Sequence, residues 1–233
     1  MTMPALTILD RFSPNHGERA APGRIDMLIL HYTGMPSAEA ALKRMCDAAA
    51  EVSAHYCIDE DGTIWRLVPE GRRAWHAGRS FWAGESDINS RSIGIELVNP
   101  GHEFGYRPFS EAQIAALEAL CHDILRRHAI PAARILGHSD IAPERKEDPG
   151  ELFPWQRLAA AGIGIWPAFG GAAPVADIAA ALAKIGYAVP TSGELRAVLT
   201  AFQRHWRPER CDGTLDAETA QCIADIAAAL PSI

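Results

Sequence analysis

Short apolar runs that end in turn residues recur in the first part of the chain and predict β-strands. The run MLILHYTG at 27–34 is apolar up to His31 and then meets a Thr-Gly turn, so we expect a buried strand over 27–31. RSIGIELVN at 91–99 and ILGH at 135–138 have the same character. A histidine that follows such a strand is held on a rigid support.

The connections between these strands are predicted to be a hairpin and helices. Asp61-Gly62 separates HYCI from TIWRLV, and Asp-Gly between two such runs is a strong hairpin signal. A helix is expected near 37–50, and another begins after Ser110, which can serve as its N-cap. In the second helix the apolar positions with helical spacing are Ile114, Leu117, Leu120, Cys121 and Ile124. The alternation predicts an α/β domain with a central mixed β-sheet flanked by helices.

The pattern changes after IWPAFGGAAPVAD at 165–177, where Gly, Ala and Pro replace patterned sequence. Beyond it only helical patterns occur, in VADIAAALAKIGY, SGELRAVLTAFQRHW and DAETAQCIADIAAAL. We therefore predict a first domain over 1–166, a linker over 167–173 and a small three-helix bundle over 174–233.

Composition narrows the classes of function. The chain has 233 residues, 48% of them hydrophobic, and a formal net charge of -7 without a Lys/Arg cluster, which argues against nucleic acid as a partner. No apolar run approaches the roughly 20 residues that cross a bilayer, and the first 20 residues do not resemble a signal peptide. The five cysteines form no CxxC pair and are interpreted as free thiols. We expect a cytoplasmic monomer, with the periplasm as the alternative compartment.

The segment GHSDIAPERKEDPG at 137–150 contains candidate metal-binding residues in one non-repetitive loop. His138 and Asp148 are residue types that bind zinc, and a catalytic zinc needs about three protein ligands with one position left for water. The best candidate for the third ligand is His31. Each signal has a simpler interpretation, since a single histidine after a strand is more often structural and the ERKED run alone is typical of a solvated loop.

Two further charged residues are candidates for catalysis. Glu96 lies within the apolar run SIGIELVN, where a carboxylate needs a partner or a role, and beside a zinc-bound water it could act as general base. Lys146 lies two residues before Asp148, where its ammonium could stabilise the oxyanion of a tetrahedral intermediate. The alternative for Glu96 is an edge-strand carboxylate that faces solvent.

Five motifs in order resemble the type-2, AmpD-like, zinc-dependent N-acetylmuramoyl-L-alanine amidases. They are LILHYTG, VSAHYCIDEDGTIWRLVPE, RRAWHAG, NSRSIGIELVN and GHSDIAPERKEDPG followed by FPW, and the resemblance covers roughly residues 24–157. It implies that His31, His138 and Asp148 bind Zn²⁺, that Glu96 is the base and that Lys146 stabilises the transition state. It also implies peptidoglycan fragments or muropeptides as the substrates.

The resemblance also indicates roles for the remaining candidate site residues. Relatives that use a cysteine as third ligand often carry a tyrosine one residue before the hairpin histidine, where this chain has Ala54. We leave His55 out of the metal set and expect it to support the site, because a catalytic zinc keeps one position open. The substrate groove is expected to include Arg73, His76 and Asn89, although Asn89 could instead form a turn.

The last part of the chain resembles the type 1 peptidoglycan-binding domain. LRAVLTAFQRHWRP and CDGTLDAETAQCI carry the resemblance, and Asp216 is expected to cap the last helix. The alternative is a helical appendage that packs on the first domain.

Two other functions compete with the amidase: a non-catalytic peptidoglycan receptor, and a zinc hydrolase with another amide substrate.

Overall fold

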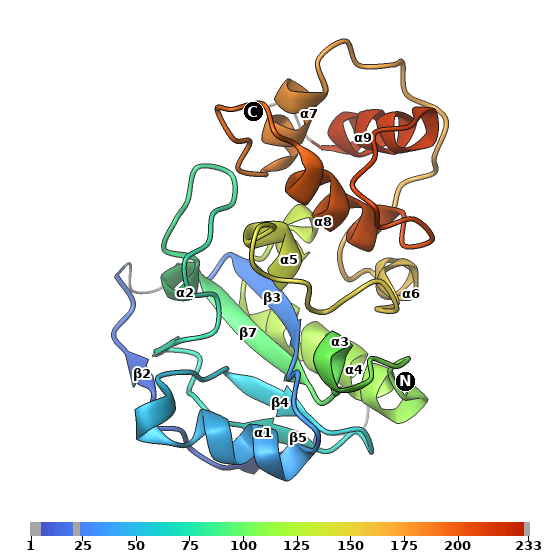
Figure 1. Ribbon diagram of the computed structural model, residues 1–233. Coiled ribbons are helices and arrows are strands. Elements are labelled where there is room, and N and C mark those ends of the chain that lie inside the picture. Colours follow the sequence, from blue (N-terminus) through green and yellow to red (C-terminus); the bar gives the residue numbers. More distant parts are fainter. Residues whose placement is uncertain (1–5, 21–23, 231–233) are drawn as a thin grey trace.

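The computed structural model describes residues 6–20 and 24–230, so the outermost parts of both predicted domains and residues 21–23 lie outside the described residues. Its centre is a six-stranded sheet with the order β1-β5-β4-β7-β3-β8 (Figure 1). The strands are β1 (Ile8–Asp10), β3 (Met27–Tyr32), β4 (Tyr56–Ile58), β5 (Ile64–Arg66), β7 (Ser92–Leu97) and β8 (Ile135–Gly137). Only the β4–β5 pair in this sheet is antiparallel. The predicted central mixed sheet is therefore confirmed.

The antiparallel pair is the hairpin that the sequence predicts. Gly62 has a φ of +88°, and a Cβ there would lie 2.9 Å from the carbonyl oxygen of Ala112. Asp61 accepts a hydrogen bond from the amide of Thr63 through Oδ1 at 2.8 Å, which closes the turn. A second, smaller sheet pairs β2 (His16–Gly17) with β6 (Arg73–Ala74).

Helices cover both faces of the central strands, which explains why these strands are apolar throughout. On one face Leu28 and Leu30 pack with residues of α4 (Glu111–Arg127). Ser110 caps α4 as expected, since its Oγ accepts from the amide of Gln113 at 3.1 Å. Met27 and Ile29 point to the opposite face and belong to another cluster. The other helices before residue 165 are α1 (Ala38–Met45), η1 (Ala48–Ala50), α2 (Ile88–Arg91), α3 (Gly101–Phe104), η2 (Ala132–Arg134), α5 (His138–Ile141) and α6 (Trp155–Ala160).

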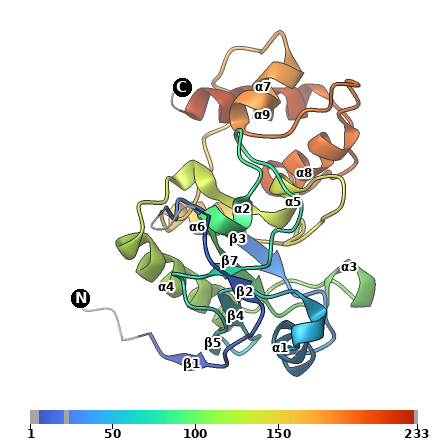
Figure 2. The ribbon, with the colours of Figure 1, turned by 90° about the vertical axis from the view of Figure 1, so that its left-hand side faces the viewer.

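Three helices follow where the pattern predicts them, α7 (Ile178–Ile185), α8 (Arg196–Trp206) and α9 (Ala217–Ala229). They lie above the sheet in Figure 1, and α8 is the one beside α5 in both ribbon views (Figure 2). Their apolar side chains are not a separate core, because Leu182 and Phe202 belong to the same buried cluster as Met27 and Ile29. None of the helices in the described ranges is long and apolar enough to cross a membrane.

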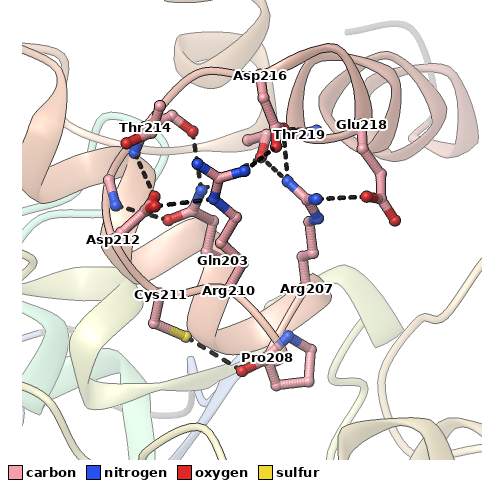
Figure 3. Close-up of polar contacts among 11 residues, drawn as sticks. Gln203, Arg207, Pro208, Arg210, Cys211, Asp212, Thr214, Asp216, Glu218 and Thr219 are labelled. Atoms are coloured by element: carbon pink, nitrogen blue, oxygen red, sulfur yellow. Dashed lines mark hydrogen bonds and ion pairs between the residues drawn. The ribbon is translucent and has the colours of Figure 1, made fainter.

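Polar contacts hold the connection between α8 and α9 (Figure 3). Gln203 donates to the carbonyl of Thr214 at 3.0 Å and accepts from the amide of Gly213 at 2.8 Å. Asp216 caps α9 as expected, with Oδ1 accepting from the amide of Thr219 at 2.8 Å. Nη1 of Arg207, at the end of α8, donates to the same oxygen at 2.5 Å, so this side chain ties the end of α8 to the cap of α9.

Candidate active site

Three of the predicted residues meet at the carboxyl ends of the parallel strands. His31 is near the end of β3, His138 is the first residue of α5 after β8, and Asp148 lies in the loop that follows. The two Nδ1 atoms of the histidines are 3.0 Å apart, and each lies 2.9–3.0 Å from Oδ2 of Asp148. All three side chains are buried. The structure thus brings together the residues that the sequence analysis nominates as metal ligands, two of them 107 positions apart.

This triangle of atoms suits a cation better than a set of hydrogen bonds. Each Nδ1 carries at most one proton, and a carboxylate only accepts, so no protonation pattern satisfies all three contacts at once. If both rings are protonated at Nδ1, the Nδ1–Nδ1 contact is repulsive; if one is not, its lone pair faces the carboxylate. Imidazole nitrogen and carboxylate oxygen are also zinc ligands, so the three residues fit Zn²⁺.

The hydrogen bonds made by the Nε2 atoms of the two histidines fix the orientation of their rings. Nε2 of His138 lies 3.1 Å from the carbonyl oxygen of Ala77, which only accepts, so this nitrogen carries the proton and Nδ1 keeps its lone pair. Nε2 of His31 lies 3.1 Å from Nδ1 of His76, and Nε2 of His76 lies 3.1 Å from Oγ of Ser92. The hydroxyl of Ser92 in turn donates to the carbonyl of Ile88 at 2.7 Å. A directional chain of hydrogen bonds therefore leaves both Nδ1 lone pairs pointing to the candidate metal position.

Charges also favour unprotonated ligands. Burial and the neighbouring His138 lower the pKa of His31 to about 4, so the ring is neutral near pH 7. Burial alone would raise the pKa of Asp148, but His138 and His31 hold it well below its ordinary value. Metal binding needs neutral imidazoles and an ionised carboxylate, so a bound cation would replace the histidine protons as the partner of the Asp148 charge.

His76 and His55 support this group. His76, which the sequence analysis places at the substrate groove, lines the cleft beside the three-residue group. Both of its ring nitrogens are engaged by His31 and Ser92, so we also assign it a role in orienting His31. His55 is buried, and its Nδ1 accepts from the amide of Gly94 at 2.9 Å. Burial, together with the charge of Arg19, lowers the pKa of His55 to about 3. His55 does not belong to the three-residue group that could hold a metal among the described residues.

The structure places Arg73 and Asn89, the other two expected substrate contacts, away from the three-residue group. Arg73 forms an ion pair with Asp87 at 3.1 Å, and Asn89 is buried with its Oδ1 accepting from the amides of His76 and Ala77 at 3.0 and 2.8 Å. Neither residue lines the cleft beside the three-residue group. Asn89 lies within α2, and its amide oxygen ties down the segment that carries His76.

Glu96 and Lys146 line a cleft of about 650 Å³ together with His138 and Asp148. The register pairs Glu96 on β7 with His31 on β3, and strand alternation places both on the same face of the sheet. Oε2 of Glu96 is buried and has no hydrogen-bond partner within residues 6–20 and 24–230. Burial, and then the charge of Asp148, raises the pKa of Glu96 well above its ordinary value, against the opposing effect of Lys146. A carboxylate with this environment is suited to accept a proton.

Sequence analysis missed several residues of the cleft. Arg145 lines it and donates through Nη2 to the same carbonyl of Ala77 that orients His138. Tyr32 and His102 form another part of the wall, with the hydroxyl of Tyr32 2.9 Å from Nδ1 of His102. Arg145 stands beside Lys146 in the ERKED run, so a closer assessment of that run could have nominated it. His102 has no comparable signal, since only the fold brings α3 to this wall.

Known proteins share the fold and the sequence. The family model described as N-acetylmuramoyl-L-alanine amidase matches residues 21–151. N-acetylmuramoyl-L-alanine amidase AmiD of Escherichia coli (strain K12) is 42% identical over 234 aligned residues, which cover 89% of this chain and 83% of AmiD.

Two solved structures extend the likeness over nearly the whole chain. One is the complex of AmiD from E. coli with the substrate anhydro-N-acetylmuramic acid-L-Ala-D-gamma-Glu-L-Lys, with a TM-score of 0.78, 41% identity and coverage of 91% of this chain and 92% of AmiD. The other is AmpDh3 from Pseudomonas aeruginosa, with a TM-score of 0.81, 36% identity and coverage of 95% and 96%. The chain therefore belongs to the type-2 N-acetylmuramoyl-L-alanine amidase family.

Proposed function

We propose that this amidase uses Zn²⁺ bound by His31, His138 and Asp148 to hydrolyse the amide between the lactyl group of N-acetylmuramic or anhydro-N-acetylmuramic acid and the L-alanine of a stem peptide. The observation that carries the proposal is the triangle of ligand atoms 2.9–3.0 Å apart beside a cleft that also holds Glu96 and Lys146. The anhydro-muramyl peptide bound to the related AmiD has this amide, which supports the choice of substrate.

The side chains divide the chemistry between them. Bound zinc would supply a Lewis acid that lowers the pKa of a water molecule and polarises the carbonyl. Glu96 accepts the proton that the attacking water releases and can return it to the leaving amine of L-alanine. The ammonium of Lys146 stabilises the negative charge that develops on the carbonyl oxygen. A non-catalytic receptor would not need, in the same cleft, a lysine and a carboxylate whose buried Oε2 lacks a hydrogen-bond partner in the described part of the chain.

We also propose that residues 174–233 form a small helical bundle that binds peptidoglycan, joined through 167–173 to the amidase domain over 1–166. The resemblance of the segment around α8 and α9 to the type 1 peptidoglycan-binding domain supports the assignment. The coverage of AmiD and AmpDh3 includes this part of the chain, so the segment is common to these relatives. Binding of the metal-free full-length protein to purified sacculi, with excess anhydro-muropeptide to occupy the amidase cleft, tests this part separately.

Product analysis by mass spectrometry tests the proposed reaction. Protein stripped of metal and reloaded with Zn²⁺ is incubated with anhydro-muropeptides and, in parallel, with sacculi. We expect free stem peptide with an L-alanine amino terminus, only in the zinc-loaded samples. Asp148→Ala should bind less zinc and release less peptide, because it removes the one carboxylate of the triangle. Zinc-loaded wild-type protein that leaves both substrates intact would contradict the amidase proposal, and full zinc occupancy in Asp148→Ala would contradict the ligand assignment.

A further inference from the structure

Asp140 is a buried carboxylate two residues after His138, on the short helix α5. Its side chain is 0% exposed. Oδ2 accepts from the amide of Gly137 at 2.8 Å, which caps the start of the helix. A carboxylate removed from water in this way needs several donors to offset the loss of hydration.

The other two donors come from the C-terminal part of the chain. The hydroxyl of Tyr187, just after α7, donates to Oδ1 of Asp140 at 2.6 Å. Nδ1 of His205, on α8, lies 2.7 Å from Oδ2 and must carry the proton, since the carboxylate only accepts. Burial, and then the charge of Asp140, raises the pKa of Tyr187 well above its ordinary value, so Tyr187 remains a donor.

His205 is held in a fixed orientation by two indole rings. Its ring stacks on Trp155 of α6, with centroids 3.8 Å apart and planes at 17°. On α8 itself it stacks on Trp206, with centroids 3.7 Å apart and planes at 4°. A ring confined in this way has little rotational freedom, so the position of its donor is set by the packing of α8 against α6.

Helix α5 connects Asp140 to the rest of the candidate metal centre. The helix begins with His138, and the amide of Ser139 donates to the carbonyl of Asp148 at 2.9 Å. The amide of Lys146 donates to the carbonyl of Ala142, at the end of the helix, at 3.1 Å. A shift of α5 would therefore move both of these ligands and the catalytic lysine together.

A second contact joins α8 to the same loop. Arg204, the residue before His205, lies 3.7 Å from Oε2 of Glu147, which stands between Lys146 and Asp148 in the sequence. Helix α8 thus contacts the segment 137–150 near its start, at Asp140, and near its end, at Glu147. Helices α5 and α8 lie side by side (Figures 1 and 2).

We propose that Tyr187 and His205 are positioning residues of the amidase centre, which act through Asp140 to hold α5 in the arrangement that binds the metal. On this proposal the C-terminal helices complete the active site, whatever they bind themselves. The inference rests on the proposed zinc site. It does not depend on which amide the protein cleaves.

Paired substitutions separate positioning from simple docking of the C-terminal helices. Tyr187→Phe removes one hydroxyl and keeps the ring. His205→Phe keeps an aromatic ring between the tryptophans and removes the donor, whereas His205→Asn keeps a donor close to the place of Nδ1. Ile226→Ala is the matched control, because Ile226 is buried on α9 in the same apolar cluster as Tyr187 and is not among the hydrogen-bond partners of Asp140.

The zinc dissociation constant, from competition with a chelator, is measured for each variant beside kcat, KM and the thermal midpoint of the metal-free protein. We expect zinc to bind about tenfold more weakly or worse in Tyr187→Phe and His205→Phe, with kcat lowered more than KM is raised. His205→Asn should recover part of the affinity. Ile226→Ala should lower the thermal midpoint and leave the zinc affinity unchanged.

The result that overturns the proposal is a lower thermal midpoint in Tyr187→Phe and His205→Phe with wild-type zinc affinity and kcat, because that is the signature of docking alone. Equal loss of zinc affinity in Ile226→Ala would overturn it as well. If the wild-type protein binds zinc and cleaves no muropeptide, the proposed function fails while the comparison of zinc affinities still decides the positioning role.

Discussion

Replacing Glu96 by glutamine should separate catalysis from metal binding. The substitution keeps the shape of the side chain and removes the base. Glu96 is outside the three-residue ligand group, so zinc occupancy should stay at the wild-type level. The loss of a general base typically lowers a rate by about 10²–10⁴-fold, which corresponds to about 3–5 kcal/mol of transition-state stabilisation.

The same substitution should stabilise the metal-free protein at neutral pH. The pKa of Glu96 is higher in the folded than in the unfolded protein. Its contribution to the free energy of unfolding is therefore complete below the unfolded pKa and is lost as the pH rises through the folded pKa. Glutamine cannot ionise, so it avoids this loss. Its advantage over glutamate should therefore be present at pH 7.5 and absent near pH 4.5.

Peptide release measured by chromatography, zinc content by atomic absorption and thermal unfolding at the two pH values test the reasoning together. The expected combination is low kcat, full zinc occupancy and a higher thermal midpoint at pH 7.5 only. A kcat within tenfold of the wild type would refute the role of base. Loss of zinc, or destabilisation at pH 7.5, would refute the description of Glu96 as a buried carboxylate outside the ligand set.

Three further substitutions test other parts of the site. Lys146→Ala should lower kcat by about 10²–10³-fold through loss of oxyanion stabilisation while zinc content stays unchanged, as steady-state rates and metal analysis would show. Gly94→Ala should weaken zinc binding in chelator competition by about tenfold or more, because its Cβ would lie 2.4 Å from Cγ of His76 and displace the ring that orients His31. His55→Asn should make the metal-free protein lose less stability between pH 7 and pH 5 in urea unfolding, since the pKa of His55 is lowered to about 3 and its contribution is lost as the pH falls from the ordinary value.

Each of these has a control or an opposing outcome. Gly71→Ala is the matched control for Gly94→Ala, because no atom lies within 4 Å of a Cβ at position 71, and it should leave zinc affinity unchanged. Zinc loss in Lys146→Ala would mean that the lysine supports the ligands rather than the transition state. An unchanged pH dependence in His55→Asn would show that other groups control acid unfolding.

Local features of the site were predictable where local sequence determines them. The apolar run before His31 and the Asp61-Gly62 turn predicted strands and a hairpin, because alternation and turn chemistry act over a few residues. Ser110 and Asp216 were recognisable as caps for the same reason. The meeting of His31 with Glu96 was not encoded locally, since it depends on which strands pair and in which register.

Residues that act through distant contacts were predicted incompletely or not at all. His76 stands in a polar loop, so its sequence context resembles that of a substrate contact. Only the fold shows that the ring is buried between His31 and Ser92. Asp140 and His205 are 65 positions apart, and no spacing rule connects them. Such pairs arise from helix packing on a shared core, which residue patterns do not specify.

Hydrolysis of a purified anhydro-muramyl peptide in H₂¹⁸O, followed by mass spectrometry of both products, tests the central claim most directly. Attack of water on the lactyl carbonyl should place one ¹⁸O atom in the carboxylate of the sugar product and release an unlabelled peptide that begins with L-alanine. This should occur with zinc and stop after chelation. Label in a peptide fragment, cleavage at any other bond, or the same products without metal would contradict the account.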